Sequence, residues 1–424
     1  MDVNLSKIKK IFFIGIGGIG ISALAKMALS RGMKVSGVND EESPKTLNPL
    51  REAGIDVLMS KATFDMPRAD MYVYSDAWLH RGPEIIKNAQ KTGKPVLSYF
   101  EALGRFAKEY KVIAIAGTHG KTTTTAMVAE ILVKAGLDPT VIVGSFVKKF
   151  ENNFRKGNSE YLVVEADEYN RHFLNFHPFI AVVLNIEADH LDYYKDLADI
   201  KNAFNKFLSQ SKNKILDYSK YLEKVPKLSV PGFHNRMNAA AALAVAEILN
   251  IKEEIAKKAL AEFSGTWRRL EKRGETKKGT IIYDDYAHHP TEIKASLQAL
   301  RELYPHTNDI GVGVYPKIGK RITVLFQPHL YSRTKALFND FAESFKGADR
   351  VLLLPIYFAR EDPDPSISSE KLAEAITRAG ENARAFSGFE LAENFVRALN
   401  LGPKDVFVTM GAGEAYKVAD KVFF

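Results

Sequence analysis

The sequence predicts an α/β protein of several domains, each built on a mainly parallel sheet. Two glycine-rich loops each follow a short apolar strand and precede a helix, at residues 11–31 and 111–132. Later apolar runs, such as 350–357 and 405–411, alternate with helical patterns, as in a doubly wound fold. A chain of 424 residues has room for two to four domains.

Composition excludes several classes of function. The chain has no cysteine, so disulfides, thiolate zinc sites and cysteine nucleophiles are excluded. Its net charge of +8 comes from scattered lysines, which favours several phosphates in small molecules over nucleic acid. The charged start and the short apolar run at 11–16 predict no signal peptide, and no run reaches membrane-spanning length. We expect a cytoplasmic protein without nucleic-acid or membrane partners.

The first element is a strand that runs into a glycine loop, IFFIGIGGIG at 11–20, followed by a helix at 22–31 and a strand at 34–38. This βαβ pattern usually indicates NAD binding, which calls for an acid at the end of the second strand. Asn39-Asp40 stand there instead. The loop therefore predicts a diphosphate at a helix N-terminus and leaves the rest of the ligand open. Its glycines are Gly15, Gly17, Gly18 and Gly20.

Strands at 70–75 and 95–99, with a helix at 83–91, continue the alternation and complete a first domain. A strand at 112–115 then leads into a second glycine loop and a helix at 126–132. That loop is Gly117-Thr118-His119-Gly120-Lys121-Thr122.

A strand, a glycine loop, Lys-Thr and a helix are the geometry that binds a nucleotide polyphosphate. The loop is a variant of G-x-x-x-x-G-K-[ST], because Ile115 stands where the first glycine is expected. The alternative is a glycine turn beside a surface lysine. Threonine is a mediocre helix former, so the run Thr122–Thr125 indicates hydroxyls wanted for phosphate or Mg²⁺.

Acidic residues follow the strands predicted at 161–166 and 179–185. Because ligands bind beyond the carboxyl ends of parallel strands, we expect Glu165 and His190 near Lys121. Carboxylates beside a phosphate loop are suitable Mg²⁺ ligands. Three other acids are expected to be solvated loop residues, namely Glu168, Glu187 and Asp192.

A helix at 231–250 carries Asn235 and Asn238 on one face of its first turn, although either of them can simply cap the helix. The charged segment 265–274 is predicted to be a linker. A third α/β domain follows, with a single helix expected at 335–346. Its strand ends carry Asp284, Asp285, Tyr286, His288 and His289, and then Gln327, His329 and Arg333. Ordinary packing remains an equal alternative for each histidine.

Taken in order, the motifs resemble those of the Mur ligase family of peptidoglycan synthesis over nearly the whole chain. Any one of them alone is a weak signal, but together they are specific. They are GIGGIGISALA (15–25), AGTHGKTTTT (116–125), VVEADEY (163–169), LNIEADHLDYY (184–194), PGFHNRMNA (231–239), RRLE (268–271), YDDYAHHPTE (283–292), QPHLYSRT (327–334) and VTMGAGE (408–414).

The resemblance implies three domains: a Rossmann-like domain at 1–107 for the UDP-sugar, a shortened P-loop ATPase domain at 108–264, and a Rossmann-like amino-acid domain at 265–424. It implies a ligase, a monomer or homodimer, that uses ATP and Mg²⁺ to join L-alanine to the lactyl carboxylate of UDP-N-acetylmuramate through an acyl phosphate. It also assigns the first glycine loop to the UDP diphosphate rather than to NAD.

The resemblance carries roles onto individual positions. For ATP they are Gly117, Thr118, His119, Gly120, Lys121, Thr122, Thr123, Asn235, Asn238, Arg269 and Asp285. For the metal they are Thr122, Glu165 and His190. For the amino acid and the acyl group they are Tyr286, His288, His329 and Arg333. The implied catalytic set is Lys121, Arg269, His190 and His288, and either histidine is a candidate for removing the amine proton.

The chain departs from the family pattern in places. The stretch from 194 to 231 is short, Asp76 replaces a serine, and Ser98–Glu101 replaces an arginine-containing stretch near the sugar site. Three alternatives stay open: a muropeptide-recycling ligase that adds a preformed peptide, a non-catalytic nucleotide-binding relative, and an NAD dehydrogenase.

Overall fold

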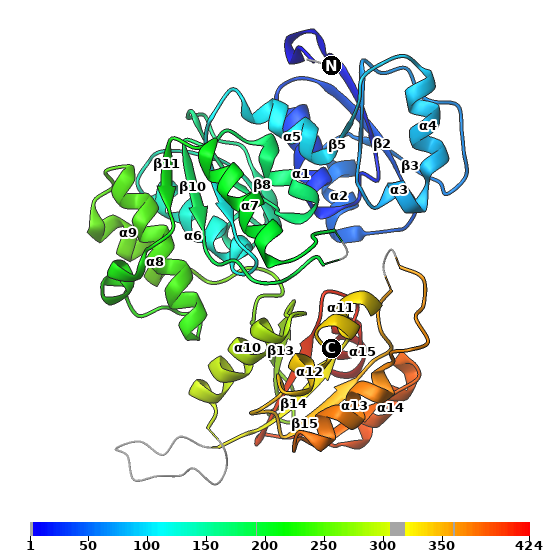
Figure 1. Cartoon of the computed structure of the whole chain (residues 1–424), viewed down its shortest axis with the longest axis vertical. Coiled ribbons are helices and arrows are strands. Elements are labelled where there is room, and N and C mark those ends of the chain that lie inside the picture. The colour runs from blue at the N-terminus through cyan, green and yellow to red at the C-terminus, as the bar shows by residue number, and fades with distance from the viewer. Residues whose placement is uncertain (1–2, 192, 306–318, 359–360) are drawn as a thin grey trace. The chain divides into compact units, whose positions relative to one another are not determined.

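The structure is a computed structural model that describes residues 3–191, 193–305, 319–358 and 361–424 (Figure 1). The chain divides into two compact units, which are described separately. The first comprises Met1–Ala188, Tyr193–Lys227 and Asn238–Ser264, and the second comprises Asp189–Asp192, Leu228–Met237 and Gly265–Phe424. No helix within the described ranges combines the length and the apolar character that crossing a bilayer requires.

The first unit begins with a five-stranded sheet of order β3-β2-β1-β4-β5, in which all neighbours are parallel. The predicted strands and helices are present, and β3, α2, α3 and α5 are additional. The strands are β1 (Lys10–Ile14), β2 (Lys34–Asn39), β3 (Asp56–Met59), β4 (Met71–Tyr74) and β5 (Val96–Ser98). The helices are α1 (Ile19–Ser30), α2 (Pro44–Glu52), α3 (Trp78–Arg81), α4 (Pro83–Lys91) and α5 (Tyr99–Ala107).

The second sheet of this unit has six strands in the order β11-β10-β6-β9-β7-β8. Only the β7–β8 pair is antiparallel. The strands are β6 (Lys111–Ala116), β7 (Thr140–Val147), β8 (Asn152–Arg155), β9 (Tyr161–Glu165), β10 (Ile180–Val183) and β11 (Asn213–Ile215). The helices are α6 (Lys121–Lys134), α7 (Leu197–Ser209) and α9 (Glu253–Ala261). Helix α8 (Phe233–Ile248) begins in the second unit and belongs to the first from Asn238 onward.

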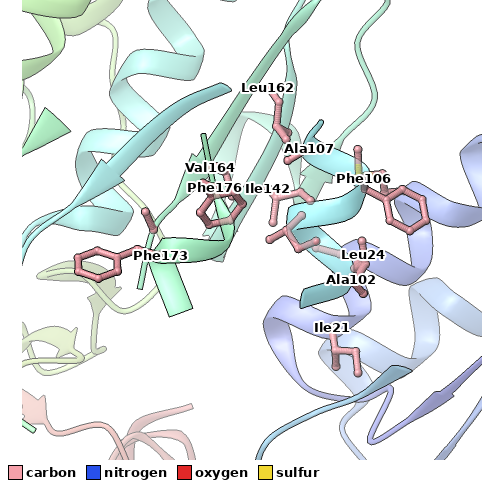
Figure 2. Close-up of a cluster of buried hydrophobic side chains, with 14 of the residues drawn as sticks. Ile21, Leu24, Ala102, Phe106, Ala107, Ile142, Leu162, Val164, Phe173 and Phe176 are labelled. Carbon is pink, nitrogen blue, oxygen red and sulfur yellow. The ribbon is translucent and has the colours of Figure 1, made fainter. Parts of the chain in front are cut away.

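One hydrophobic core joins the two sheets of the first unit (Figure 2). Leu24 of α1 and Phe106 of α5 belong to the same cluster as Ile142, Val164 and Phe173, which come from β7, β9 and the 3-10 segment Tyr169–Asn175. Burying one such side chain contributes about 1.5–3 kcal/mol. The two glycine loops are therefore held by one packed body.

The second unit contains a six-stranded sheet of order β12-β13-β17-β14-β15-β16. Only β12–β13 is antiparallel. The strands are β12 (Glu271–Glu275), β13 (Ile281–Asp285), β14 (Arg321–Phe326), β15 (Arg350–Leu353), β16 (Ala383–Ala385) and β17 (Asp405–Met410). The helices are α10 (Pro290–Leu303), α11 (Tyr331–Ala336), α12 (Phe338–Ala342), α13 (Ser369–Arg378), α14 (Phe389–Ala398) and α15 (Tyr416–Phe423).

Helices cover both faces of this third sheet. Leu297 of α10 and Leu372 of α13 belong to one apolar cluster, whereas Val396 of α14 and Val418 of α15 belong to another. The doubly wound prediction is therefore confirmed for this sheet.

Two predictions for the second unit are wrong. The segment predicted as a linker at 265–274 ends in β12, whose backbone pairs with β13, so sheet hydrogen bonds outweigh its high charge. The helix predicted at 335–346 is interrupted at Leu337, where the backbone leaves helical geometry between α11 and α12.

Candidate functional site

Asn39, at the end of β2, shapes the first glycine loop. Its Oδ1 accepts a hydrogen bond from the Gly17 amide at 3.0 Å, and its Nδ2 donates to the Glu41 carbonyl at 2.7 Å. A Cβ on Gly17 would lie 2.6 Å from Asn39 Nδ2, so this close approach requires glycine. Asn39 is buried, and its side-chain amide stabilises the glycine loop. This role explains why an asparagine stands here and not the acid that would bind a ribose.

A cavity of about 360 Å³ lies between the two sheets of the first unit. Gly18 and Gly20 of the first loop line it together with Lys121 of the second. Gly15 and Gly17 do not line it. The predicted diphosphate loop and the predicted nucleotide lysine therefore face one space. The other polar and aromatic lining residues are Ser75, Asp76, Tyr99, Phe100, Glu165 and Asp167.

The second glycine loop is held in place by Asn185, which follows β10. Asn185 Oδ1 accepts from the His119 amide at 2.8 Å, and its Nδ2 donates to the His119 carbonyl at 3.1 Å. Gly117 and Gly120 have φ values of +138° and +85°, which side-chain-bearing residues rarely adopt. Helix α6 starts at Lys121, so its free amides lie beside this loop.

We expect Gly120→Ala to weaken ATP binding as well as the fold. The new Cβ would lie 2.4 Å from Asn238 Oδ1 at a positive φ, so the loop must shift away from α8. The matched control is Gly136→Ala, which has a φ of +77° and nothing within 4 Å of its Cβ. The control should lose about 1 kcal/mol from backbone strain alone and keep its affinity for ATP, measured by titration calorimetry. Equal ATP affinity in the two variants would contradict this view of the loop.

Lys121 is paired with Glu168. Its Nζ donates to the Glu168 carboxylate at 2.8 and 3.0 Å and to the Gly117 carbonyl at 2.6 Å. Burial alone would lower the pKa of Lys121, but the carboxylates of Glu168 and Asp167 outweigh it and raise that pKa. The prediction that Glu168 is solvated is wrong, because this side chain is buried.

Burial is also the main cause that raises the pKa of Glu168 to about 7, while the ammonium of Lys121 acts in the opposite direction. Of the other two acids expected to be solvated, Glu187 is half-buried with its carboxylate 3.5 Å from His119 Nε2. Asp192 lies outside the described residues.

Two of the three predicted metal ligands lie side by side. Thr122 Oγ1 donates to Glu165 Oε2 at 3.1 Å, and Glu165 Oε1 accepts from the Gly144 amide at 2.5 Å. A hydroxyl and a carboxylate at the start of a phosphate-binding helix are the hard oxygen ligands that suit Mg²⁺. This donor set therefore fits the metal that the sequence implies.

The four threonines do not all serve the site. Thr124 and Thr125 are fully buried in α6, and their hydroxyl oxygens have no hydrogen-bond partner among the described residues. The interpretation that the whole threonine run offers hydroxyls to phosphate or metal is therefore wrong for these two. Thr122 and Thr123 begin the helix and stay candidates.

The third predicted metal ligand, His190, belongs to the second unit. Its backbone has a φ of +55°, and its amide donates to the neighbouring Asp189 Oδ1 at 2.8 Å. Asn235 and Asn238 lie one turn apart at the start of α8, as predicted, and both are buried. Asn235 Nδ2 donates to the Pro231 carbonyl at 2.7 Å.

Glu292, in the first turn of α10, organises the site residues that follow β13. Its carboxylate accepts from the His288 amide at 3.0 Å, lies 3.2 Å from His288 Nδ1 and stands 3.8 Å from Arg269 Nη1. The Arg269 guanidinium also lies 5.1 Å from the ring centre of Tyr286. Glu292 ends the YDDYAHHPTE motif, but no pattern in the sequence predicts this role for it.

Asp285 lies at the end of β13 and is buried. Its carboxylate accepts from the Ser296 hydroxyl and from the Ala287 amide. Burial raises the pKa of Asp285 to about 6, although the Ser296 hydrogen bond and Arg269 act in the opposite direction.

Arg333 is held by Asp189. Its Nε donates to Asp189 Oδ1 at 3.1 Å, and its Nη1 lies 3.3 Å from His329 Nδ1. Burial alone would raise the pKa of Asp189, but Arg333 and the nearby histidines outweigh it and hold that pKa far below its usual range. The His288 and His329 rings are 6.0 Å apart. The predicted set of Tyr286, His288, His329 and Arg333 is thus one contiguous cluster.

Comparisons with known proteins agree with this geometry. Residues 10–111 match the Mur ligase family catalytic domain, residues 115–219 match the Mur ligase middle domain, and residues 268–413 match the glutamate ligase domain of Mur ligases. The UDP-N-acetylmuramate–L-alanine ligase of Caldanaerobacter subterraneus is 37% identical, over 99% of this chain and 98% of that protein. This alignment spans 471 positions against 424 residues here, so the relative has segments that this chain lacks.

Solved structures show the same fold. The UDP-N-acetylmuramate–alanine ligase of Thermotoga maritima matches with a TM-score of 0.79 and 27% identity, over 97% of this chain and 98% of that one. A murein peptide ligase from Psychrobacter arcticus matches with a TM-score of 0.67 and 23% identity, over 98% of each chain, and supports the fold alone. The predicted three-domain α/β architecture is therefore confirmed, and the chain belongs to the Mur ligase family.

Proposed function

We propose that this protein joins L-alanine to the lactyl carboxylate of UDP-N-acetylmuramate at the expense of ATP, in cytoplasmic peptidoglycan synthesis. The observation that supports this most is the shared cavity of the first unit, in which the diphosphate loop and Lys121 face the same space. Near-full-length relatives named as UDP-N-acetylmuramate–L-alanine ligases support the choice of substrates.

In the first step, the lactyl carboxylate attacks the γ-phosphorus of ATP, giving an acyl phosphate and ADP. Lys121 would leave Glu168 to contact the β- and γ-phosphates, and the amides of the second glycine loop and of α6 would bind phosphate oxygens. Thr122, Glu165 and His190 would hold Mg²⁺. When bound, this ion would neutralise part of the charge on the phosphates. Asn235, Asn238, Arg269 and Asp285 would complete the ATP site.

In the second step, the amine of alanine attacks the acyl carbon and phosphate leaves. A guanidinium suits the carboxylate of the incoming amino acid because it can donate two parallel hydrogen bonds. Asp189 already occupies Arg333 in this way, so the amino-acid carboxylate would compete with Asp189. Tyr286 and His329 would flank the amino acid.

The proton of the attacking amine must go to a base, for which His190 and His288 are the candidates. We favour His288, because the Tyr286 carbonyl and the Glu292 carboxylate both lie close to its Nδ1. Contacts at Nδ1 fix the orientation of the imidazole ring, so that Nε2 can face the substrate.

Phosphate release from ATP tests the function directly. With UDP-N-acetylmuramate, ATP and Mg²⁺, we expect L-alanine to give the highest rate among alanine, serine, glycine and a muropeptide tripeptide. A mixture without the sugar nucleotide is the control and should release no phosphate above background. A response to the tripeptide but not to L-alanine would favour the muropeptide-recycling ligase. Absence of ADP with every acceptor would favour a non-catalytic relative, and flat NADH fluorescence on titration would dismiss the dehydrogenase.

A further inference from the structure

The wall of the cavity in the first unit has more acidic than basic side chains, although the expected ligand is negatively charged. Asp76, Glu165 and Asp167 line it, whereas Lys121 is its only lysine or arginine in the part of the chain that the structure describes. Lys121 is already paired with Glu168. A sugar nucleotide with a diphosphate and a carboxylate is itself strongly negative, so negative charge in the wall opposes its binding unless a cation offsets it.

Asp76 lines the cavity together with Gly18 and Gly20 of the first glycine loop. It follows Ser75, whose Oγ lies 3.9 Å from where a Cβ on Gly18 would stand.

A buried histidine outside the cavity wall provides the missing positive charge. His172 Nε2 lies 2.8 Å from Asp76 Oδ2, and its Nδ1 lies 3.7 Å from Asp167 Oδ2. Its ring stacks on Phe100, with ring centres 3.9 Å apart and an interplanar angle of 14°. One imidazole thus contacts three residues that line the cavity without lining it itself.

The charge state of His172 follows from these contacts. Burial alone would lower its pKa, but the carboxylates of Asp167 and Asp76 outweigh burial and raise the pKa to about 9. At neutral pH the ring is therefore an imidazolium that faces two carboxylates.

We propose that His172 is a positioning residue that neutralises Asp76 and holds Phe100 against the cavity, so that this chain accepts a sugar nucleotide with a diphosphate and a carboxylate. The inference rests on the proposed function and adds a residue to it. His172 can do both because it contacts Asp76 and Phe100 at once.

The test is His172→Gln, which keeps a hydrogen-bond donor and removes the charge. We expect the KM for UDP-N-acetylmuramate to rise by about tenfold or more, because a carboxylate facing the substrate loses its counter-ion. The KM for ATP and kcat should change by less than about twofold, since loss of ground-state binding to one substrate raises only that KM. The matched control is His177→Gln, an exposed histidine shortly after the 3-10 segment that contains His172. It should change neither KM nor kcat.

The double variant His172→Gln/Asp76→Ser separates charge from structure. If Asp76 needs His172 only as a counter-ion, removing both restores the KM for the sugar nucleotide to within about threefold of the original. If the KM for ATP rises in parallel and the second substitution restores nothing, His172 only supports the fold and the inference is overturned. A raised KM in Asp76→Ser alone also overturns it, because Asp76 would then bind substrate directly.

Failure of the inference is distinct from failure of the proposed function. An unmodified protein that is inactive with UDP-N-acetylmuramate and L-alanine refutes the function. Titration calorimetry of UDP-N-acetylmuramate against the unmodified protein and the variants then still tests the role of His172, without turnover. Equal affinity of the unmodified protein and His172→Gln in that titration refutes the inference.

Discussion

Lys121→Ala is expected to abolish ATP-dependent phosphate release, by a factor of about 10³ or more, while the protein stays folded. An ammonium placed at the transferring phosphoryl group offsets the charge that develops there, and this is a main part of catalysis in phosphoryl transfer. Lys121 lies at the first position of α6 and in the wall of the cavity. Steady-state phosphate release measures the loss, and circular dichroism shows whether the fold remains.

The same substitution leaves Glu168 buried without its partner. We expect a loss of about 1–3 kcal/mol of stability, because a buried polar group loses its hydrogen bonds. The loss is limited, because removing Lys121 raises the pKa of Glu168 further and lets the carboxyl take up a proton. Lys121→Ala/Glu168→Gln should therefore recover stability and stay inactive. Recovered activity in this double variant would refute the role given to Lys121.

Lys134→Ala is the matched control on the same helix. Lys134 pairs with Glu262 at 2.6 Å near the surface, and such a pair contributes at most about 1 kcal/mol. This variant should keep its phosphate release. Equal loss of activity in Lys121→Ala and Lys134→Ala would mean that damage to α6, and not loss of the ammonium, explains the result.

The sequence predicts the parts of this protein that local patterns determine. The glycine loop that follows β6 and the chemistry at the ends of β9 and β13 follow from glycine spacing, apolar runs and the order of strands. These are features that a stretch of about ten residues specifies by itself. The helix predicted at 126–132 begins earlier, at Lys121.

The interaction partners of the site residues cannot be predicted from local patterns, because they come from distant parts of the chain. Glu168 looks like a solvated acid in the sequence, but its partner is 47 residues away. Asp189 and Arg333 are 144 residues apart. Nothing local to His172 distinguishes it from the exposed His177.

The adjacent arginines Arg268 and Arg269 show this limit most clearly, and they give the second large expected effect. Arg268 is buried, and its Nε donates to Asp284 Oδ2 at 2.9 Å, while its Nη atoms donate to the carbonyls of Gly411 and Gly413. Arg269 is more exposed and meets Glu292 and Tyr286. Only the second of the two has the access that a ligand-binding residue needs.

Arg268→Ala is expected to destabilise the second unit by about 3–5 kcal/mol, since it leaves the buried carboxylate of Asp284 without its counter-ion. Arg269→Ala should change stability by less than about 1 kcal/mol and lower phosphate release about 100-fold or more, through the ATP site. The chain has two tryptophans, so in a Trp78→Phe background the fluorescence of Trp267 reports unfolding of the second unit in urea.

A further substitution separates an unpaired charge from lost packing around Arg268. Arg268→Ala/Asp284→Asn should recover part of the lost stability, because no buried charge is left unpaired and Thr409 still donates to position 284. Arg269→Ala should gain nothing from the same second change, since Arg269 pairs with Glu292 instead. If Arg269→Ala unfolds at the lower urea concentration, or Arg268→Ala stays stable and inactive, the roles of the two neighbours are reversed. Arg268 would then be the residue needed for activity, and Arg269 the residue needed for stability.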